Sequence, residues 1–165
     1  MDFEFLYLDL EGRISRKTWW LGAIGIVVLN FLVSTVVSMI AAIMGVASTA
    51  VGIGLTSLIV LALLFRPLQA LTLKRLHDRD RPEQLFWYFI GPSILSALIV
   101  MLGIGGGIDE ISILGTSVPV YRPNFAGALV NVASTAMFFW MLWELGIKRG
   151  DAGPNTHGPD PLGAV

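Results

Sequence analysis

The chain has 165 residues, of which 55% are hydrophobic and 14% charged, with a mean hydropathy of +0.73 and a net charge of −1. Soluble domains carry about 25% charged residues, so this composition excludes an ordinary water-soluble protein and favours a single membrane domain over residues 1–165. The absence of cysteine excludes disulfides, thiolate metal sites and a cysteine nucleophile.

The first eleven residues alternate acidic and apolar side chains. This pattern is typical of a short strand, or of an interfacial segment whose aromatic side chains lie against lipid headgroups. A secretory signal peptide begins with basic residues and has a shorter apolar region. We therefore expect the first apolar segment to remain in the protein as a membrane span.

Four apolar segments follow, at approximately residues 20–44, 50–73, 85–104 and 125–147. Each is close to the length of about 20 residues that crosses a bilayer as a helix. The sequence therefore predicts an all-α membrane protein with a four-transmembrane-helix bundle. The connection over 105–124 alternates apolar residues with Ser, Thr and Gly, which is typical of a small exposed hairpin.

The distribution of basic residues predicts the orientation. Four spans bring the N-terminus, the loop after the second span and the C-terminus to one side, and Arg122 is the one basic residue of 11 on the other side. The positive-inside rule makes the crowded side cytoplasmic. Acidic residues on that side match the basic ones in number, so any attraction for anionic lipid must be local to a few arginines.

Two charged residues fall within the predicted spans. Arg66 lies close enough to the end of the second span for its side chain to reach the interface. The alternative is that Arg66 faces the interior of the bundle and pairs with Glu144 of the fourth span. Glu144 and Lys148 are four residues apart and are expected to form an ion pair on the helix surface.

Three motifs are spaced between these segments. They are Gly12-Arg13-Ile14-Ser15-Arg16, then Arg75-Leu76-His77-Asp78, and finally Gly150-x-x-Gly153-x-Asn155-x-x-Gly158-Pro159-Asp160-Pro161. In order and spacing the chain resembles the bacterial inner-membrane family catalogued as domain of unknown function 805. The resemblance implies a multi-pass protein of the bacterial inner membrane and leaves the biochemical activity open. The chain departs from the family pattern at Arg79 and after it, and at His157.

An even number of spans brings the three motifs to one membrane face, where two interpretations are open. In the first, a structural latch pairs Arg13 and Arg16 with Asp78 and Asp160 and holds the tail, residues 150–165, against the bundle. In the second, the basic side chains bind a phosphate, a lipid headgroup or an acidic segment of a partner, with Arg75 pointing toward the headgroup layer. The candidate residues are Arg13, Arg16, Arg75, His77, Asp78, Asn155 and Asp160.

The motifs do not predict an enzyme. His77 with Asp78, and His157 with Asp160, lack the spacing of a metal site, and we expect no cofactor and no nucleic-acid partner. The sequence favours an interaction or scaffold protein in the lipid bilayer, with a membrane protein or a second copy as partner. The alternatives are a binder of an anionic lipid headgroup or small anion at the cytoplasmic face and, less favoured, an accessory subunit of a transporter.

Overall fold

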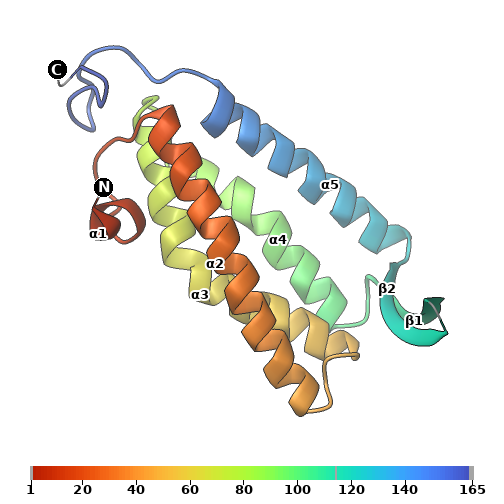
Figure 1. Ribbon diagram of the computed structural model, residues 1–165. Coiled ribbons are helices and arrows are strands. Elements are labelled where there is room, and N and C mark those ends of the chain that lie inside the picture. Colours follow the sequence, from red (N-terminus) through yellow and green to blue (C-terminus); the bar gives the residue numbers. More distant parts are fainter. Residues whose placement is uncertain (1, 114, 164–165) are drawn as a thin grey trace.

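The computed structural model of the chain describes residues 2–113 and 115–163, and it is mostly helical (Figure 1). Its elements, in chain order, are α1 (Phe3–Tyr7), α2 (Arg16–Ile43), α3 (Ala50–His77), α4 (Leu85–Met101), β1 (Gly106–Ile113), β2 (Thr116–Pro123), α5 (Phe125–Met141) and the π-helical turn η1 (Leu142–Ile147). The four apolar segments predicted from the sequence coincide with α2, α3, α4 and α5 continued by η1.

Three helical segments are long and apolar enough to cross a membrane, namely α2, α3 and the segment Phe125–Ile147. The fourth, α4, has 17 residues and would extend about 26 Å at about 1.5 Å per residue. Large apolar side chains such as Val27, Phe31 and Val132 are each more than two-thirds exposed. Such a surface is stable in hydrocarbon and unfavourable in water, so it indicates a lipid bilayer as the solvent.

Polar side chains define where these helices begin. The Ser15 hydroxyl accepts a hydrogen bond from the Thr18 N–H at 3.2 Å at the start of α2, and Thr49 accepts one from Gly52 at 2.9 Å at the start of α3. Asn124 does the same for α5. Each N-cap satisfies a backbone N–H that has no partner within the helix, which is especially valuable where water is scarce.

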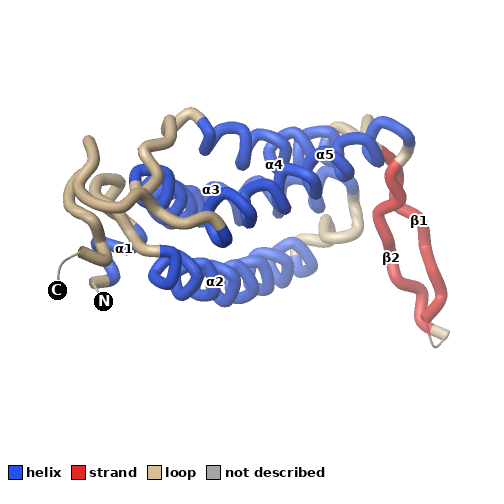
Figure 2. Tube along the Cα trace, turned by 90° about the horizontal axis from the view of Figure 1, so that it is seen from above, coloured by secondary structure: helices blue, strands red, loops and turns tan. Residues whose placement is uncertain are grey.

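The helices are arranged so that both ends of the chain meet. α2 packs on α3, α3 on α4 and α4 on α5, while α2 meets η1 near its first turn. The termini, α1 and the connection after α3 lie at one end of the molecule, and the hairpin lies at the other (Figures 1 and 2). Every residue from Ala70 to Asp78 is buried, so the end of α3 is the centre around which the other segments pack.

Two sequence-based predictions change. The fold is mostly helical, as predicted, but it is not entirely so, because β1 and β2 pair as an antiparallel hairpin with Gly106 opposite Pro123 and Ile113 opposite Thr116. The hairpin expected from the alternation in 105–124 is thereby confirmed. The strand interpretation of the first residues is wrong, because they form α1, whose first turn is capped when the Asp2 carboxylate accepts the Glu4 N–H at 3.0 Å.

Candidate functional site

Three segments distant in sequence form a polar layer over the end of α3. They are residues 2–15, 78–84 and 148–163, and we call them together the cap (Figure 1). Under the cap, the side chains of Lys74 and Arg75 are completely buried. A buried cation is strongly unfavourable unless acceptors surround it, so the partners of these side chains determine how the cap is built.

Arg13 joins all three segments of the cap. Its Nε and Nη2 donate to Oδ1 of Asp78 at 3.3 and 3.1 Å, and both side chains are buried. Its Nη1 donates to the carbonyl of Gly153 at 2.8 Å and to that of Gly158 at 3.1 Å, and Nη2 also donates to the carbonyl of Asp151 at 2.8 Å. The guanidinium therefore supplies the acceptors of an irregular tail with donors that a helix or sheet would otherwise provide.

Arg75 approaches the other side of the Asp78 carboxylate, where its Nη1 donates to Oδ2. Its Nε donates to the carbonyl of Leu145 at 2.8 Å and its Nη2 to that of Lys148 at 2.6 Å. These carbonyls belong to the end of the fourth helical segment, where the helix stops and leaves acceptors free. Arg75 is 0% exposed, so the prediction that it points toward the headgroup layer is wrong: the tail covers it.

The two aspartates of the motifs have different environments. Burial raises the pKa of the Asp78 carboxyl, and the charges of Arg75 and Arg13 act against that rise. Hydrogen bonds from the backbone N–H groups of Leu162 and Gly153 lower the pKa of the Asp160 carboxyl. Asp78 therefore binds the buried arginines at the centre of the cap, whereas Asp160 stabilises a turn within the tail.

The tail passes directly over Asp78. The Asp151 N–H donates to the backbone carbonyl of Asp78 at 2.8 Å, and a Cβ on Gly150 would lie 1.9 Å from Asp78 Oδ2. Only glycine fits this approach, because any larger residue would collide with the carboxylate.

His77 connects the same three segments on the other side of the cap. Its Nδ1 lies 3.1 Å from the carbonyl of Gly12, and its Nε2 lies 3.0 Å from a carboxylate oxygen of Glu83. Both ring nitrogens thus face acceptors, and the ring can donate to both only as an imidazolium. His157 of the tail stacks on His77 at 3.9 Å, and the Asn155 amide donates to the His77 carbonyl at 2.8 Å.

A second ion cluster surrounds Glu144, which is 3% exposed. Its carboxylate accepts from Arg79, from Lys148 Nζ at 2.8 Å, and is 3.4 Å from Nε of Arg81. The predicted pair with Lys148 is confirmed. Three cations surround one buried carboxylate, so this cluster has an excess of positive charge. Its members come from the end of the last helical segment and from the connection after α3.

The predicted alternative of an Arg66–Glu144 pair is wrong. Arg66 is exposed, and its Nε donates to the carbonyl of Leu8 at 2.9 Å. Lys74 holds the same segment more firmly, because its Nζ donates to the carbonyls of Phe5, Leu6 and Asp9, the last two at 3.1 and 2.8 Å. Both cations fasten the N-terminal segment to α3 through backbone carbonyls rather than through carboxylates.

Of the residues predicted for the site, the structure joins Arg13, Arg75 and Asp78 in one network, and Asn155 donates to the carbonyl of His77 on the other side of the cap. The predicted pair of Arg16 with Asp160 is not formed. Arg13 precedes α2 rather than sharing a helical face with Arg16, whose Nη1 donates to the carbonyl of Ile147 at 2.9 Å.

Sequence reasoning missed two cations, namely Lys74 as the partner of carbonyls in the N-terminal segment and Arg79 as a partner of Glu144. The available signal was their position beside the motifs, at the ends of apolar segments that offer unpaired carbonyls. Among residues 2–113 and 115–163, no group of three His, Cys, Asp or Glu side chains is placed to hold a metal ion. In this arrangement each buried cation binds several backbone carbonyls at once and so holds the segments of the cap together.

Comparison with known proteins gives a family and nothing more specific. No curated protein and no solved structure matches the chain. A family model described as "Protein of unknown function (DUF805)" matches residues 7–159, a range that includes α2 to α5 and nearly the whole cap. The first two motifs and the third up to Pro159 fall within that range, and the chain therefore belongs to the DUF805 family.

Proposed function

We propose that this protein is an interaction protein of the bacterial inner membrane whose ordered cap forms a cytoplasmic surface for a partner. The chain would be one domain with four spans. Both termini lie at the same end of the molecule, as an even number of crossings would require, and this supports α4 as a span beside the three longer segments (Figure 1). That end carries many more Lys and Arg residues than the opposite end, which supports a cytoplasmic location for the cap.

The observation that carries the proposal is the Arg13–Asp78–Arg75 network. Its donors are engaged by the protein's own carbonyls and by Asp78, at a place where both arginines are buried. This supports the latch interpretation over an anion site made of Arg13, Arg75 and His77, since an incoming anion would have to displace the tail. A latch of this strength gives the cap one defined shape.

A defined shape is what a docking surface requires, because an ordered surface loses little conformational entropy on binding. The cap also exposes charges of both signs that its internal bonds leave accessible. The side chains of Asp80, Arg81 and Glu83 are 54%, 47% and 58% exposed, respectively. Charges of mixed sign on a fixed frame favour recognition of a complementary protein surface.

Photocrosslinking in intact cells tests the proposal. A photoreactive amino acid would replace Ala152, which is exposed in the cap, and in a matched control would replace Ser48, which is exposed at the opposite end. We expect a discrete protein adduct from position 152 and not from 48. The adduct should disappear when the latch is opened by Asp78→Ala while the protein is still inserted in the membrane.

Identical adducts from both positions, or an adduct at 152 that survives Asp78→Ala unchanged, would contradict the proposal. The identity of the adduct separates the remaining alternatives. A transport protein in the adduct would favour an accessory-subunit role, and another copy of this chain would favour homo-oligomerisation through the cap.

A further inference from the structure

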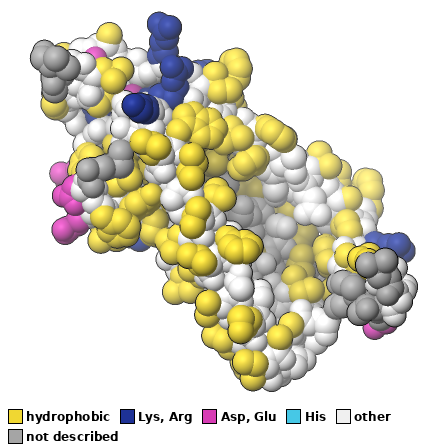
Figure 3. Space-filling model, in the orientation of Figure 1, with side chains coloured by type: hydrophobic (Ala, Val, Ile, Leu, Met, Phe, Trp, Pro, Cys, Tyr) yellow, Lys and Arg dark blue, Asp and Glu magenta, His cyan; other side chains and the backbone are white. Residues whose placement is uncertain are grey.

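A groove runs along the face between α2 and α5. Near the cap it is a cavity of about 410 Å³, lined by Trp20 and Val27 of α2, Phe138 and Met141 of α5 and Leu71 of α3. Figure 3 shows the hollow along this face and Lys and Arg side chains gathered at the end above it. The groove lies within the apolar segments, so hydrocarbon is the solvent at its opening.

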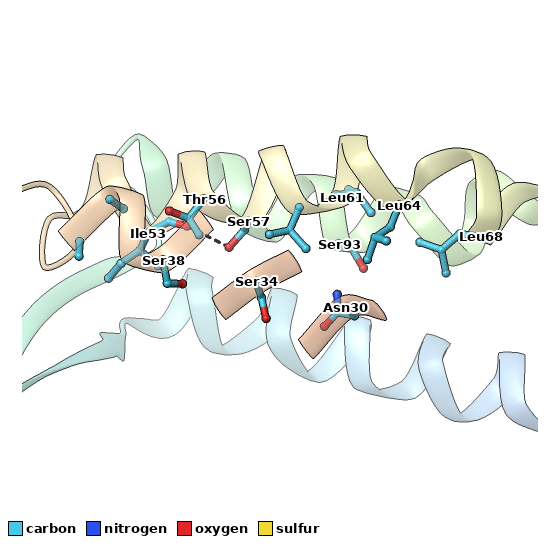
Figure 4. A pocket seen from close by; sticks show the side chains of 13 residues that line it. Asn30, Ser34, Ser38, Ile53, Thr56, Ser57, Leu61, Leu64, Leu68 and Ser93 are labelled. Atoms are coloured by element: carbon cyan, nitrogen blue, oxygen red, sulfur yellow. Dashed lines mark hydrogen bonds between the residues drawn. The ribbon is translucent and has the colours of Figure 1, made fainter. Parts of the chain in front are cut away.

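A second cavity of about 520 Å³ lies farther from the cap, and Leu68 lines both cavities. Figure 4 shows Ser34 of α2 opposite Ser57 of α3 across this part. Their hydroxyls donate to carbonyls of their own helices, Ser34 to Phe31 at 3.1 Å and Ser57 to Ile53 at 2.9 Å. The serines are therefore satisfied internally and leave a wall that a hydrocarbon chain can contact.

Two exposed arginines stand at the cap end of the groove. Arg16 precedes Trp20 by one helical turn, on the α2 face that continues into the groove. Arg16 and Arg149 together line a third cavity, of about 320 Å³. Within the described parts of the chain Arg149 has no hydrogen-bond or ion-pair partner, and only Nη1 of Arg16 is engaged, by Ile147.

The carboxylates that line this third cavity are largely committed elsewhere. Asp78 is held by Arg13 and Arg75, and Asp160 accepts two backbone N–H groups. The third, Asp151, is exposed. Two arginines with free donors thus remain at the junction between the polar cap and the apolar groove.

We infer that the groove binds an anionic phospholipid, with its phosphate at Arg16 and Arg149 and an acyl chain between α2 and α5. An empty groove would leave its lining without contacts, so lipid tails fill any such space that opens to the bilayer. An acyl chain that moves from the bilayer into the groove stays in an apolar environment and gains no hydrophobic free energy. Selectivity among lipids must therefore come from the headgroup.

Native mass spectrometry of the full-length protein, with phosphatidylglycerol and phosphatidylcholine of matched chains, tests the inference. We expect preferential retention of phosphatidylglycerol. The change Arg149→Gln should reduce that preference about fivefold, and the double change Arg16→Gln with Arg149→Gln should reduce it further, since each basic residue near the surface adds about the same attraction. Arg122→Gln, which removes an exposed arginine at the opposite end, is the control and should change nothing.

The acyl chain has its own test. Ala23→Trp would fill the groove and should lower retention of phosphatidylglycerol with both arginines intact, whereas Val36→Trp, also on α2 but outside the groove lining, should not. Glycerol 3-phosphate carries a phosphate anion without tails and should not be retained.

Four outcomes would overturn the inference. The first is equal retention of the two lipids, and the second is a preference that survives the double arginine change in protein with wild-type thermal stability. The third is a lipid-free dimer that dissociates when Ala23→Trp blocks the groove, which would assign the groove to a second copy. Retention of glycerol 3-phosphate as tight as that of the lipid would likewise assign the arginines to a free anion. The inference is independent of the proposed protein partner, because its readout is lipid bound to purified protein.

Discussion

Arg13 and Asp78, 65 residues apart in sequence, form an ion pair with Nη2 3.1 Å from Oδ1, and their side chains are 1% and 4% exposed. A pair buried to this extent differs in kind from a surface salt bridge. Loss of one partner leaves the other charge buried without compensation, whereas exposed pairs contribute little because water and salt screen them. The chain contains both kinds, since Arg122 and Asp109 form an exposed pair at 3.1 Å on the hairpin.

The first prediction compares these two pairs. Asp78→Ala should lower the free energy of unfolding by about 3 kcal/mol or more, and Asp109→Ala by less than about 1 kcal/mol, in denaturant titrations of detergent-solubilised protein. Arg13→Ala combined with Asp78→Ala should cost less than the sum of the single changes, because either one already breaks the shared network. Strictly additive costs would show that the pair does not act as a unit.

The second prediction concerns the tail. Asn155→Ala removes the hydrogen bond to the His77 carbonyl, and Pro154→Ala changes a neighbouring exposed residue that makes no such bond. A net hydrogen bond is worth about 1 kcal/mol, so we expect protease trimming within residues 150–160 to be about fivefold faster in Asn155→Ala. The Pro154→Ala variant should be trimmed more like the wild type. Rapid trimming of the wild type itself would show that the tail is not held.

The third prediction concerns the N-terminal segment. Lys74→Met keeps most of the side-chain volume and removes the ammonium that binds the carbonyls of Phe5, Leu6 and Asp9. We expect amide hydrogen exchange over residues 3–9 to increase at least tenfold. Arg66→Met, which removes a single bond to Leu8 from an exposed side chain, should have a smaller effect. Equal effects of the two variants would mean that burial of Lys74 adds nothing to its hold on this segment.

The fourth prediction is the topology, and the absence of native cysteine makes it direct to measure. Single cysteines at Glu11, Gln84 and Ala152, all exposed in or beside the cap, should resist an impermeant thiol reagent in intact cells and react after lysis. Cysteines at Ser48 and Ser112, exposed at the opposite end, should react in intact cells. Reaction at position 84 before lysis would reverse the orientation.

The sequence predicted the helices well and the contacts of charged residues poorly, for a physical reason. Apolar length and alternation are local properties of the chain, and they were sufficient for α2 to α5 and for the hairpin. Which carbonyls stay unpaired depends on where each helix ends in three dimensions. The π-helical turn η1 and the path of the tail expose the carbonyls of Leu145 and Lys148 to Arg75, and neither feature has a signature in the sequence.

The same reason explains why the alternative of an Arg66–Glu144 pair is wrong. That alternative rests on the rule that a charge in hydrocarbon requires a partner. The cap supplies closer partners to each, namely the Leu8 carbonyl for Arg66 and Arg79 for Glu144. A charge near a helix end has many candidate partners, so residue type alone does not select among them.

The close passage of Gly150 over Asp78 bears on how the protein is made. During synthesis Arg13, Arg75 and Asp78 emerge long before the tail whose carbonyls complete their network. Until residues 150–158 are translated, the arginines have only part of their acceptors, and water or another protein must serve in place of the tail. Maturation of the cap is therefore a late event in biogenesis, and a ribosome stalled after η1 would leave Arg13 without the carbonyls of Gly153 and Gly158.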